Sequence, residues 1–179
     1  WSNISGATNG TLTFAAATAD NNKQYRAVWT NSTSADNSNA ATLTVIPIPA
    51  APGVTVVNNC GSSTLTANSF TGSLLWSNGA TTTSITVATA GTYTVTQTVN
   101  GCSSAPASGI ATPKIIPGAP TVEVVNICES SILTASGFTG TLLWSTGETT
   151  SFISVTSAGN YSVTQTVDGC TSAAGNGTA

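Results

Sequence analysis

The sequence contains no histidine and no methionine, and it carries few charges of either sign. Charged residues make up 5% of the 179 residues, against about 25% in an ordinary globular domain. The three cations (Lys23, Arg26 and Lys114) lie far apart in sequence. No basic patch can therefore neutralise phosphates, which argues against nucleic-acid binding. Without histidine, paired carboxylates or an expected free thiolate, nothing activates a Ser or Thr nucleophile. We expect no enzyme, no catalytic residue and no cofactor.

Long apolar runs are also missing. None approaches the roughly 18 residues that a membrane-spanning helix needs, so we expect no membrane insertion. The oxygen-rich segments Asp20–Asn22 and Asp36–Asn39 are the strongest candidates for calcium, which takes about six to eight oxygen ligands. Their acidic density is low, and Asp and Asn are common in turns. A turn is the favoured interpretation, and we expect no metal site.

The residues that are present favour β-structure. Hydrophobic residues make up 40% of the chain, too many for a disordered protein. Roughly a fifth of the residues are threonine, whose β-branched side chain suits a pleated, half-wet surface. No stretch shows a 3.6-residue apolar period. The expected fold class is all-β, with essentially no helix.

An internal repeat dominates the chain. Two segments align without a gap at an offset of 68 residues, with Cys60, Trp76, Tyr93 and Cys102 matching Cys128, Trp144, Tyr161 and Cys170. Proline-rich linkers precede both segments. We divide the chain into a segment 1–46, a linker 47–53, a repeat 54–112, a linker 113–120 and a repeat 121–179 whose last strand is truncated. Because proline restricts the backbone, the linkers should be short and semi-rigid.

Each repeat shows alternating apolar residues between turn signals, the pattern of short strands. In the first repeat the expected strands are 54–57, 63–67, 74–77, 84–87 and 92–99. Trp76, Trp144, Tyr93 and Tyr161 are expected in the core, although an exposed Trp would suit sugar stacking. The threonine rows, which resemble ice- or glycan-binding arrays, are more simply a solvated sheet face. Gln97 and Gln165 fall on the inward side near a strand end, where we expect them to be partly exposed with backbone partners.

Residues 1–46 follow a different pattern. Thr11–Phe14 predicts a strand, and the run D-x-x-x-x-Y-x-A-x-W at residues 20–29 resembles the E–F corner and F strand of immunoglobulin-like domains. The resemblance implies that Tyr25 is the corner tyrosine in the core, and that Ala27 replaces the second core cysteine. Residues 1–46 would then be the C-terminal half (strands C′ to G) of such a domain, without its inter-sheet disulfide. The whole chain is expected to form immunoglobulin-like sandwiches in a linear array.

The four cysteines, Cys60, Cys102, Cys128 and Cys170, favour disulfides and an oxidising, extracellular location. The preferred pairing is within repeats, Cys60 with Cys102 and Cys128 with Cys170. In a seven-stranded sandwich these positions lie at opposite ends, too far apart for a bridge. Loss of one middle strand would reverse the last strand and bring them together. A bridge between repeats, Cys60 to Cys170, is the open alternative.

The frame C-x-S-S-x-L-T-A, W-S-x-G-x-T-T and A-G-x-Y-x-V-T-Q-T-V-x-G-C resembles repeats of giant cell-surface adhesins of Bacteroidota. These include gliding-motility adhesins exported by the type IX secretion system. The resemblance implies a stalk or surface filament that presents a distal adhesive region and contacts neighbouring repeats of the same chain. Two alternatives stay open: a module that binds glycan or other cells, and a protomer of a self-assembled extracellular fibre.

Overall fold

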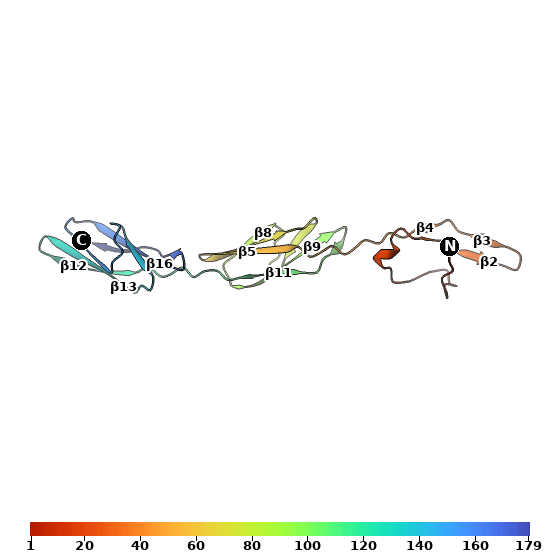
Figure 1. Cartoon of the computed structure of the whole chain (residues 1–179), viewed down its shortest axis with the longest axis horizontal. Helices are drawn as coiled ribbons and strands as arrows, with labels where there is room; N and C mark the ends of the chain where they lie inside the picture. The colour runs from red at the N-terminus through yellow and green to blue at the C-terminus, as the bar shows by residue number, and fades with distance from the viewer.

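The computed structural model describes all 179 residues, Trp1–Ala179. It contains 18 strands and a single 3-10 helical turn, η1 (Thr18–Asp20), so the all-β prediction is confirmed. Figure 1 shows the N-terminal segment at one end of the long axis, the first repeat in the middle and the second repeat at the other end. No helix of the structure has the length and apolar character needed to cross a bilayer.

The first repeat is a sandwich of two antiparallel sheets. One sheet has the order β5-β6-β8, and the other is built around β9, which pairs with β7, β10 and β11. The strands are β5 (Gly53–Asn59), β6 (Ser62–Asn68), β7 (Ser73–Trp76), β8 (Ser84–Val87), β9 (Gly91–Val99), β10 (Cys102–Ser103) and β11 (Ala107–Ala111).

The second repeat has the same arrangement. One sheet has the order β12-β13-β15, and in the other β16 pairs with β14, β17 and β18. The strands are β12 (Thr121–Ile127), β13 (Ser130–Ser136), β14 (Thr141–Trp144), β15 (Phe152–Val155), β16 (Asn160–Val167), β17 (Cys170–Thr171) and β18 (Gly175–Thr178). The last strand pairs along its whole length with Asn160–Val163 of β16, and Ala179 exchanges backbone hydrogen bonds with Gly159.

Strand directions explain the sandwich. β8 runs antiparallel to β6, and β7 runs antiparallel to β9. Both β7 and β8 therefore run away from the end of the repeat that lies next to the linker 47–53. The loop 77–83 carries the chain from one sheet to the other without reversing its direction. The arrangement matches the A-B-E and C-F-G sheets of an immunoglobulin-type sandwich with the D strand absent.

Each repeat has its own core, built by period-2 alternation along the strands. In the first repeat the most buried side chains are Leu65, Trp76 and Val95, at 0%, 1% and 0% exposure. Trp76 satisfies its indole by donating from Nε1 to the carbonyl of Thr82 at 2.8 Å, as a buried Trp N–H requires. The equivalent residues Leu133, Trp144 and Val163 form the second core.

Two tyrosines fix the turn that enters the central strand of each repeat. The hydroxyl of Tyr93 donates to the carbonyl of Thr89 at 3.2 Å, and that of Tyr161 donates to Ser157 at 2.9 Å. Both rings are half-buried and pack against the cores. In each case the hydroxyl bonds the carbonyl of the residue four positions upstream, which is the hydrogen bond of the tyrosine corner in immunoglobulin-type sandwiches.

The N-terminal segment is much thinner. Its strands form one long hairpin, in which β1 (Gln24–Tyr25) pairs with β4 (Ala41–Thr42) and β2 (Val28–Thr30) pairs with β3 (Ala35–Asn37). None of its side chains is buried. Without a second sheet opposite the hairpin, apolar residues such as Trp29, at 62% exposure, stay in solvent.

Two expectations for this segment are wrong. Residues Thr11–Phe14 form no strand, because no neighbouring strand is available to receive their backbone hydrogen bonds. Tyr25 is only half-buried and makes no corner hydrogen bond. Its ring packs instead on Phe14, with centroids 5.2 Å apart.

Asp20 takes part in a local turn. Its carboxylate accepts hydrogen bonds from Lys23 Nζ at 2.6 Å and from the backbone N–H of Ala17 at 2.8 Å. These bonds hold the pKa of Asp20 below its usual range, and the carboxylate raises the pKa of Lys23. The pair is exposed at the surface, so its contribution to stability is small.

Candidate functional site: the bridged joint between the repeats

The disulfide of the chain joins the two repeats. Cys60 bonds Cys170 with a Cα–Cα distance of 5.5 Å across a sequence separation of 110 residues. Cys102 and Cys128 carry free thiols. The preferred pairing within repeats is therefore wrong, and the pairing left open as the alternative is the one formed.

The direction of the strands explains this correction. Cys60 follows β5, at the end of the first repeat that faces the second, whereas Cys102 pairs with Val99 at the other end. The seven residues of β5, at about 3.3 Å each, hold these ends roughly 20 Å apart. A disulfide needs Cα atoms within about 7 Å. Loss of the D strand does not reverse the last strand, because β7 and β8 run the same way.

The linker docks beside the disulfide. Lys114 donates its backbone N–H to the carbonyl of Asn59 at 2.9 Å, and its carbonyl accepts the N–H of Gly61 at 2.8 Å, which forms a parallel bridge next to Cys60. The ammonium group of Lys114 donates to the carbonyl of Asp168 in the second repeat at 3.2 Å. Lys114 thus contacts both sides of the joint.

Gly61 gives the linker room at this point. Its φ is +74°, a conformation that favours glycine. A Cβ at this position would lie 3.0 Å from Cδ1 of Ile116. Ile116 therefore packs directly over the turn between β5 and β6, next to the bridged cysteine.

A buried glutamine anchors each linker to the repeat that follows it. Gln97 donates from Nε2 to the carbonyl of Ala50 at 2.7 Å, and its Oε1 accepts the N–H groups of Thr71 and Gly72 at 2.9 and 3.1 Å. Gln165 makes the same bonds, to the carbonyl of Gly118 and from Thr139 and Gly140.

Both glutamines are 3% exposed, so the expectation of partial exposure is wrong, although the expected backbone partners are present. The linker itself covers the side chain. A buried amide is tolerated because its donor and its acceptor are both satisfied.

The two repeats are thus connected covalently twice, through the linker 113–120 and through the disulfide. β5 spans the first repeat from end to end and ends at Asn59, directly before Cys60. β17 and β18 span the second repeat from Cys170 onward. Because strands are already nearly extended, the route from Gly53 through the disulfide to Ala179 contains little slack.

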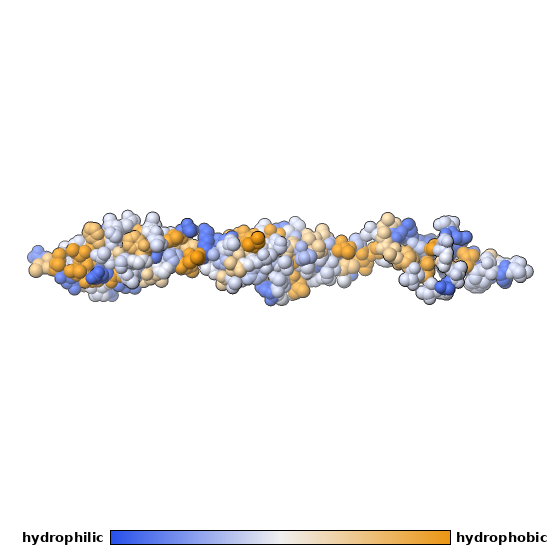
Figure 2. Space-filling view, turned by 90° about the horizontal axis from the view of Figure 1, so that it is seen from below, coloured by the Kyte–Doolittle hydropathy of each residue, from blue (hydrophilic) through white to orange (hydrophobic).

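The joint between the N-terminal segment and the first repeat lacks these connections. The linkers share the sequence I-P-x-A-P, at Ile48–Pro52 and Ile116–Pro120. No disulfide, strand pair or hydrogen bond ties residues 1–45 to the first repeat. Ile48 is 75% exposed, against 52% for the equivalent Ile116. Figure 2 shows apolar colour at both narrow junctions of the molecule.

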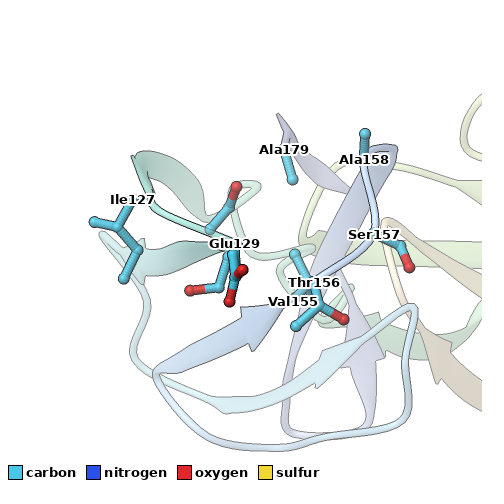
Figure 3. A pocket seen from close by; sticks show the side chains of 9 residues that line it. Ile127, Glu129, Val155, Thr156, Ser157, Ala158 and Ala179 are labelled. Carbon is cyan, nitrogen blue, oxygen red and sulfur yellow. The ribbon is translucent and has the colours of Figure 1, made fainter.

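At the far end of the second repeat, the turn between β12 and β13 is the counterpart of the Cys60 turn. Cys128 is exposed, and the neighbouring Ile127 is 52% exposed. Glu129 has φ +61°, close to that of its counterpart Gly61. An open hollow of about 230 Å³ lies beside this turn. Figure 3 shows Glu129 between Ile127 and the strand end at Val155, with Ala179 above.

Sequence reasoning identified the cysteines but missed Lys114, Ile116 and the role of the glutamines at the joint. One signal was available. The linker I-P-x-A-P and the glutamine that it contacts, Gln97 or Gln165, are the same number of residues apart in both repeats. A polar residue at an inward position then suggests a partner that lies outside the sandwich.

The comparisons with known proteins are limited. No protein-family model matches the sequence, and no curated protein matches it. Among solved structures, the chain resembles the chicken interferon gamma receptor alpha chain, with 11% identity and a TM-score of 0.36, over 74% of this chain and 98% of the other.

It also resembles a two-domain fibronectin type-III segment of chicken tenascin, with 11% identity and a TM-score of 0.31, over 72% and 98% of the two chains. For murine CEACAM1b the identity is 14% and the TM-score 0.31, over 69% and 96%. These similarities are too low to bear on function, which has to be inferred from the joint.

Proposed function

We propose that this chain is a spacer segment of a long extracellular stalk or surface filament, in which tandem immunoglobulin-like repeats form a linear array. The observation that carries the proposal is the disulfide between Cys60 and Cys170, which joins neighbouring repeats instead of stapling each repeat internally. A bridge at this position fixes the joint. It does little for a binding site within one repeat.

The proposed mechanism is mechanical. With two covalent connections at one joint, the repeats have little freedom to bend or twist against each other. Tension along the stalk passes through β5, the disulfide and β17–β18, and the rest of both repeats lies within a closed covalent loop. The docked linker and the Lys114 contact with the carbonyl of Asp168 restrict the joint further.

An extracellular location is supported by the disulfide, since such bonds persist in oxidising compartments. The resemblance of the repeat frame to Bacteroidota adhesins extends the proposal to a stalk that is exported by type IX secretion and presents a distal adhesive region. Neighbouring repeats of the same chain are the proposed partners. No observation in the structure favours catalysis.

The test is the distribution of distances across the joint. Spin labels are placed through unnatural amino acids at the exposed positions Thr55 and Glu123, and pulsed dipolar spectroscopy is recorded for the wild type and for C60S/C170S. We expect a narrow distribution in the wild type and a broad one in the variant. The control C102S/C128S removes only the free thiols and should match the wild type.

Equal widths with and without the disulfide would contradict the proposal. A glycan array with the intact chain addresses the alternative of a binding module, for which selective binding to one glycan class would be expected. For a spacer, no glycan should be retained above the background of a denatured sample.

A further inference from the structure

We infer that the outer face of the sheet β12-β13-β15 in the second repeat (the docking face) binds a basic partner protein, one that presents apolar side chains beside lysine or arginine. The inference goes beyond the spacer function, because it assigns a lateral contact to one repeat of the pair. It is based on the differences between two repeats that share their fold and more than half of their aligned residues.

One kind of difference between the repeats is confined to this face. When residues 53–111 are compared with residues 121–179, a polar residue is replaced by an aliphatic or aromatic one at three positions. The replaced pairs are Asn59 and Ile127, Thr64 and Ile132, and Ser84 and Phe152. Side chains alternate between the two faces along a strand, and all three positions fall on the face that points away from the core.

The apolar side chains of the docking face are neighbours across the strands. Ile132 pairs with Val125 on one side and with Ser154 on the other. Phe152 pairs with Thr134, two residues along β13 from Ile132, so its ring is within diagonal reach of Ile132. Val125 and Phe152 are 50% and 56% exposed. Because an antiparallel sheet usually turns polar residues to solvent, a contiguous apolar group here is typical of an interaction surface.

The first repeat shows that the neighbouring parts of the chain leave this face open. Its following linker and the next repeat are both in place, yet Val57, the counterpart of Val125, is 59% exposed. Beside it the face is polar, with the hydroxyls of Thr64 and Thr86 3.4 Å apart. The linker and the second repeat contact the end of the sandwich at Cys60. The face of the sheet is therefore free for a partner in either repeat, and only the second repeat makes it apolar.

The second repeat also differs from the first in charge. Residues 53–111 contain no charged side chain, whereas residues 121–179 contain four acidic side chains and no basic one. Asp168 lies at the joint, where its carbonyl accepts a hydrogen bond from Lys114. The other three acidic residues are glutamates, and they are the only glutamates of the chain. All three are exposed, and none is in an ion pair.

The glutamates lie on and around the docking face. Glu123 is on the face itself, in the same cross-strand row as Phe152. Glu129 is in the turn between β12 and β13, and Glu148 is in the loop that leads into β15. Figure 2 shows apolar and strongly hydrophilic residues side by side on the second repeat.

This charge identifies the chemistry of the partner. Unpaired carboxylates beside an apolar group favour a surface that brings apolar side chains together with lysine or arginine. A second copy docked through the same face would bring the glutamates of both copies to one contact, where like charges cost binding free energy. The second repeat has no cation to offset them. The occupant is therefore a basic protein of another sequence.

The test uses the full chain with its Cys60–Cys170 bond intact, and a random-peptide display library as the probe. Selection for binding to the wild type is followed by counter-selection against E123T/I132T/F152S, which carries the residues of the first repeat at these positions. Enriched peptides should combine lysine or arginine with aliphatic or aromatic residues. Their dissociation constants, measured by fluorescence anisotropy, should rise about tenfold or more in the variant.

The first repeat supplies a matched gain of binding. T55E/T64I/S84F gives its outer face the side chains of the second repeat, next to a valine that both repeats share. This variant should bind two peptides per chain where the wild type binds one, as measured by isothermal titration calorimetry. Every substitution introduces the residue of the equivalent exposed position, so both variants should keep the thermal transitions of the wild type, which confirms that they are folded.

Three results would overturn the inference: peptides that bind E123T/I132T/F152S as tightly as the wild type, enriched peptides that are acidic, or no enrichment at all. Dimers of the wild type in sedimentation experiments, lost in the variant, would identify a second copy as the occupant and would also overturn it. None of these results depends on the disulfide. The spin-label measurement tests the bridged joint alone, so failure of the docking face and failure of the spacer function are separable.

Discussion

Pulling the chain from its two ends tests the tension path directly. In the oxidised protein, force applied at the termini bypasses residues 61–169, because Cys60 and Cys170 hold the ends of that loop together. In C60S, or after reduction, the force has to pass through both repeats. We expect the two forms to differ in the length of chain that force can extract.

The expected length follows from the size of the loop that the disulfide between Cys60 and Cys170 closes. A sequence separation of 110 residues, at about 3.3–3.6 Å per extended residue, corresponds to about 36–40 nm of contour. Reduction should release this length in two steps, one for each repeat. The oxidised protein should show neither step, and only the thin N-terminal segment and the strands outside the loop remain extensible.

The assay is single-molecule force spectroscopy with tethers attached to the termini without thiol chemistry. The wild type is measured with and without reductant, and C60S serves as a permanently open form. The control C102S/C128S should behave as the wild type does in both conditions. Two unfolding steps in the oxidised wild type would refute the reasoning, because both repeats would then lie outside the closed loop.

Three substitutions test the packing of the first repeat. Gln97→Leu removes the two hydrogen bonds from the N–H groups of Thr71 and Gly72 and the one to the carbonyl of Ala50, and we expect a loss of about 3 kcal/mol by chemical denaturation. Gly109→Ala places a methyl group 2.8–2.9 Å from the side chains that face it, and overpacking should cost about 1–3 kcal/mol. Tyr93→Phe removes the corner hydrogen bond and should cost about 1 kcal/mol in the same assay.

Matched controls are available for the substitutions of Gln97 and Gly109. Gln24→Leu changes an exposed glutamine in the N-terminal hairpin and should leave the transition of the first repeat unchanged. Gly118→Ala introduces the residue that the other linker carries as Ala50, with no atom within 4 Å of the new methyl group, and should be neutral. A neutral result for Gln97→Leu would show that the linker does not cover the glutamine in solution.

Strand positions within the repeats could be predicted because period-2 patterns carry that information. The segments expected at 63–67, 84–87 and 92–99 match β6, β8 and β9 closely. Trp76 within L-L-W-S was expected in the core and lies there, 1% exposed. Such patterns work where one face of a strand is buried by a complete opposite sheet.

The N-terminal segment shows the limit of this reasoning. Its strand pattern at Thr11–Phe14 resembles those in the repeats, yet no sheet faces it and no strand forms there. A local pattern states which side chains prefer burial. It does not supply the surface that buries them.

The predicted disulfide pairing within repeats was wrong for a different reason. Alternation assigns each residue to a face, but it does not give the direction in which a strand runs. The position of Cys60 relative to Cys102 depends on whether the connection between Trp76 and Ser84 reverses the chain. Both outcomes are compatible with the same sequence pattern, and only the pairing of β7 with β9 decides between them.

The placement of the bridge has a consequence for how each repeat is stabilised. A bridge within one repeat would close about 40 residues and contribute about 4 kcal/mol to that repeat, whereas the bridge between repeats closes a loop of 110 residues and contributes about 5 kcal/mol by the chain-entropy relation. The entropic gain is thus similar, but it is shared by two units and fixes their joint.

Each repeat, of about 60 residues, must then fold without an internal disulfide. At this size a single hydrophobic core is only marginally sufficient to stabilise a fold. The buried Trp, the tyrosine corner and the glutamine that recruits the linker supply that stability locally. The cysteines are thereby left free for the joint. Since the bridge needs both neighbours folded to hold its sulfur atoms together, it should form late in folding and only between correctly aligned repeats.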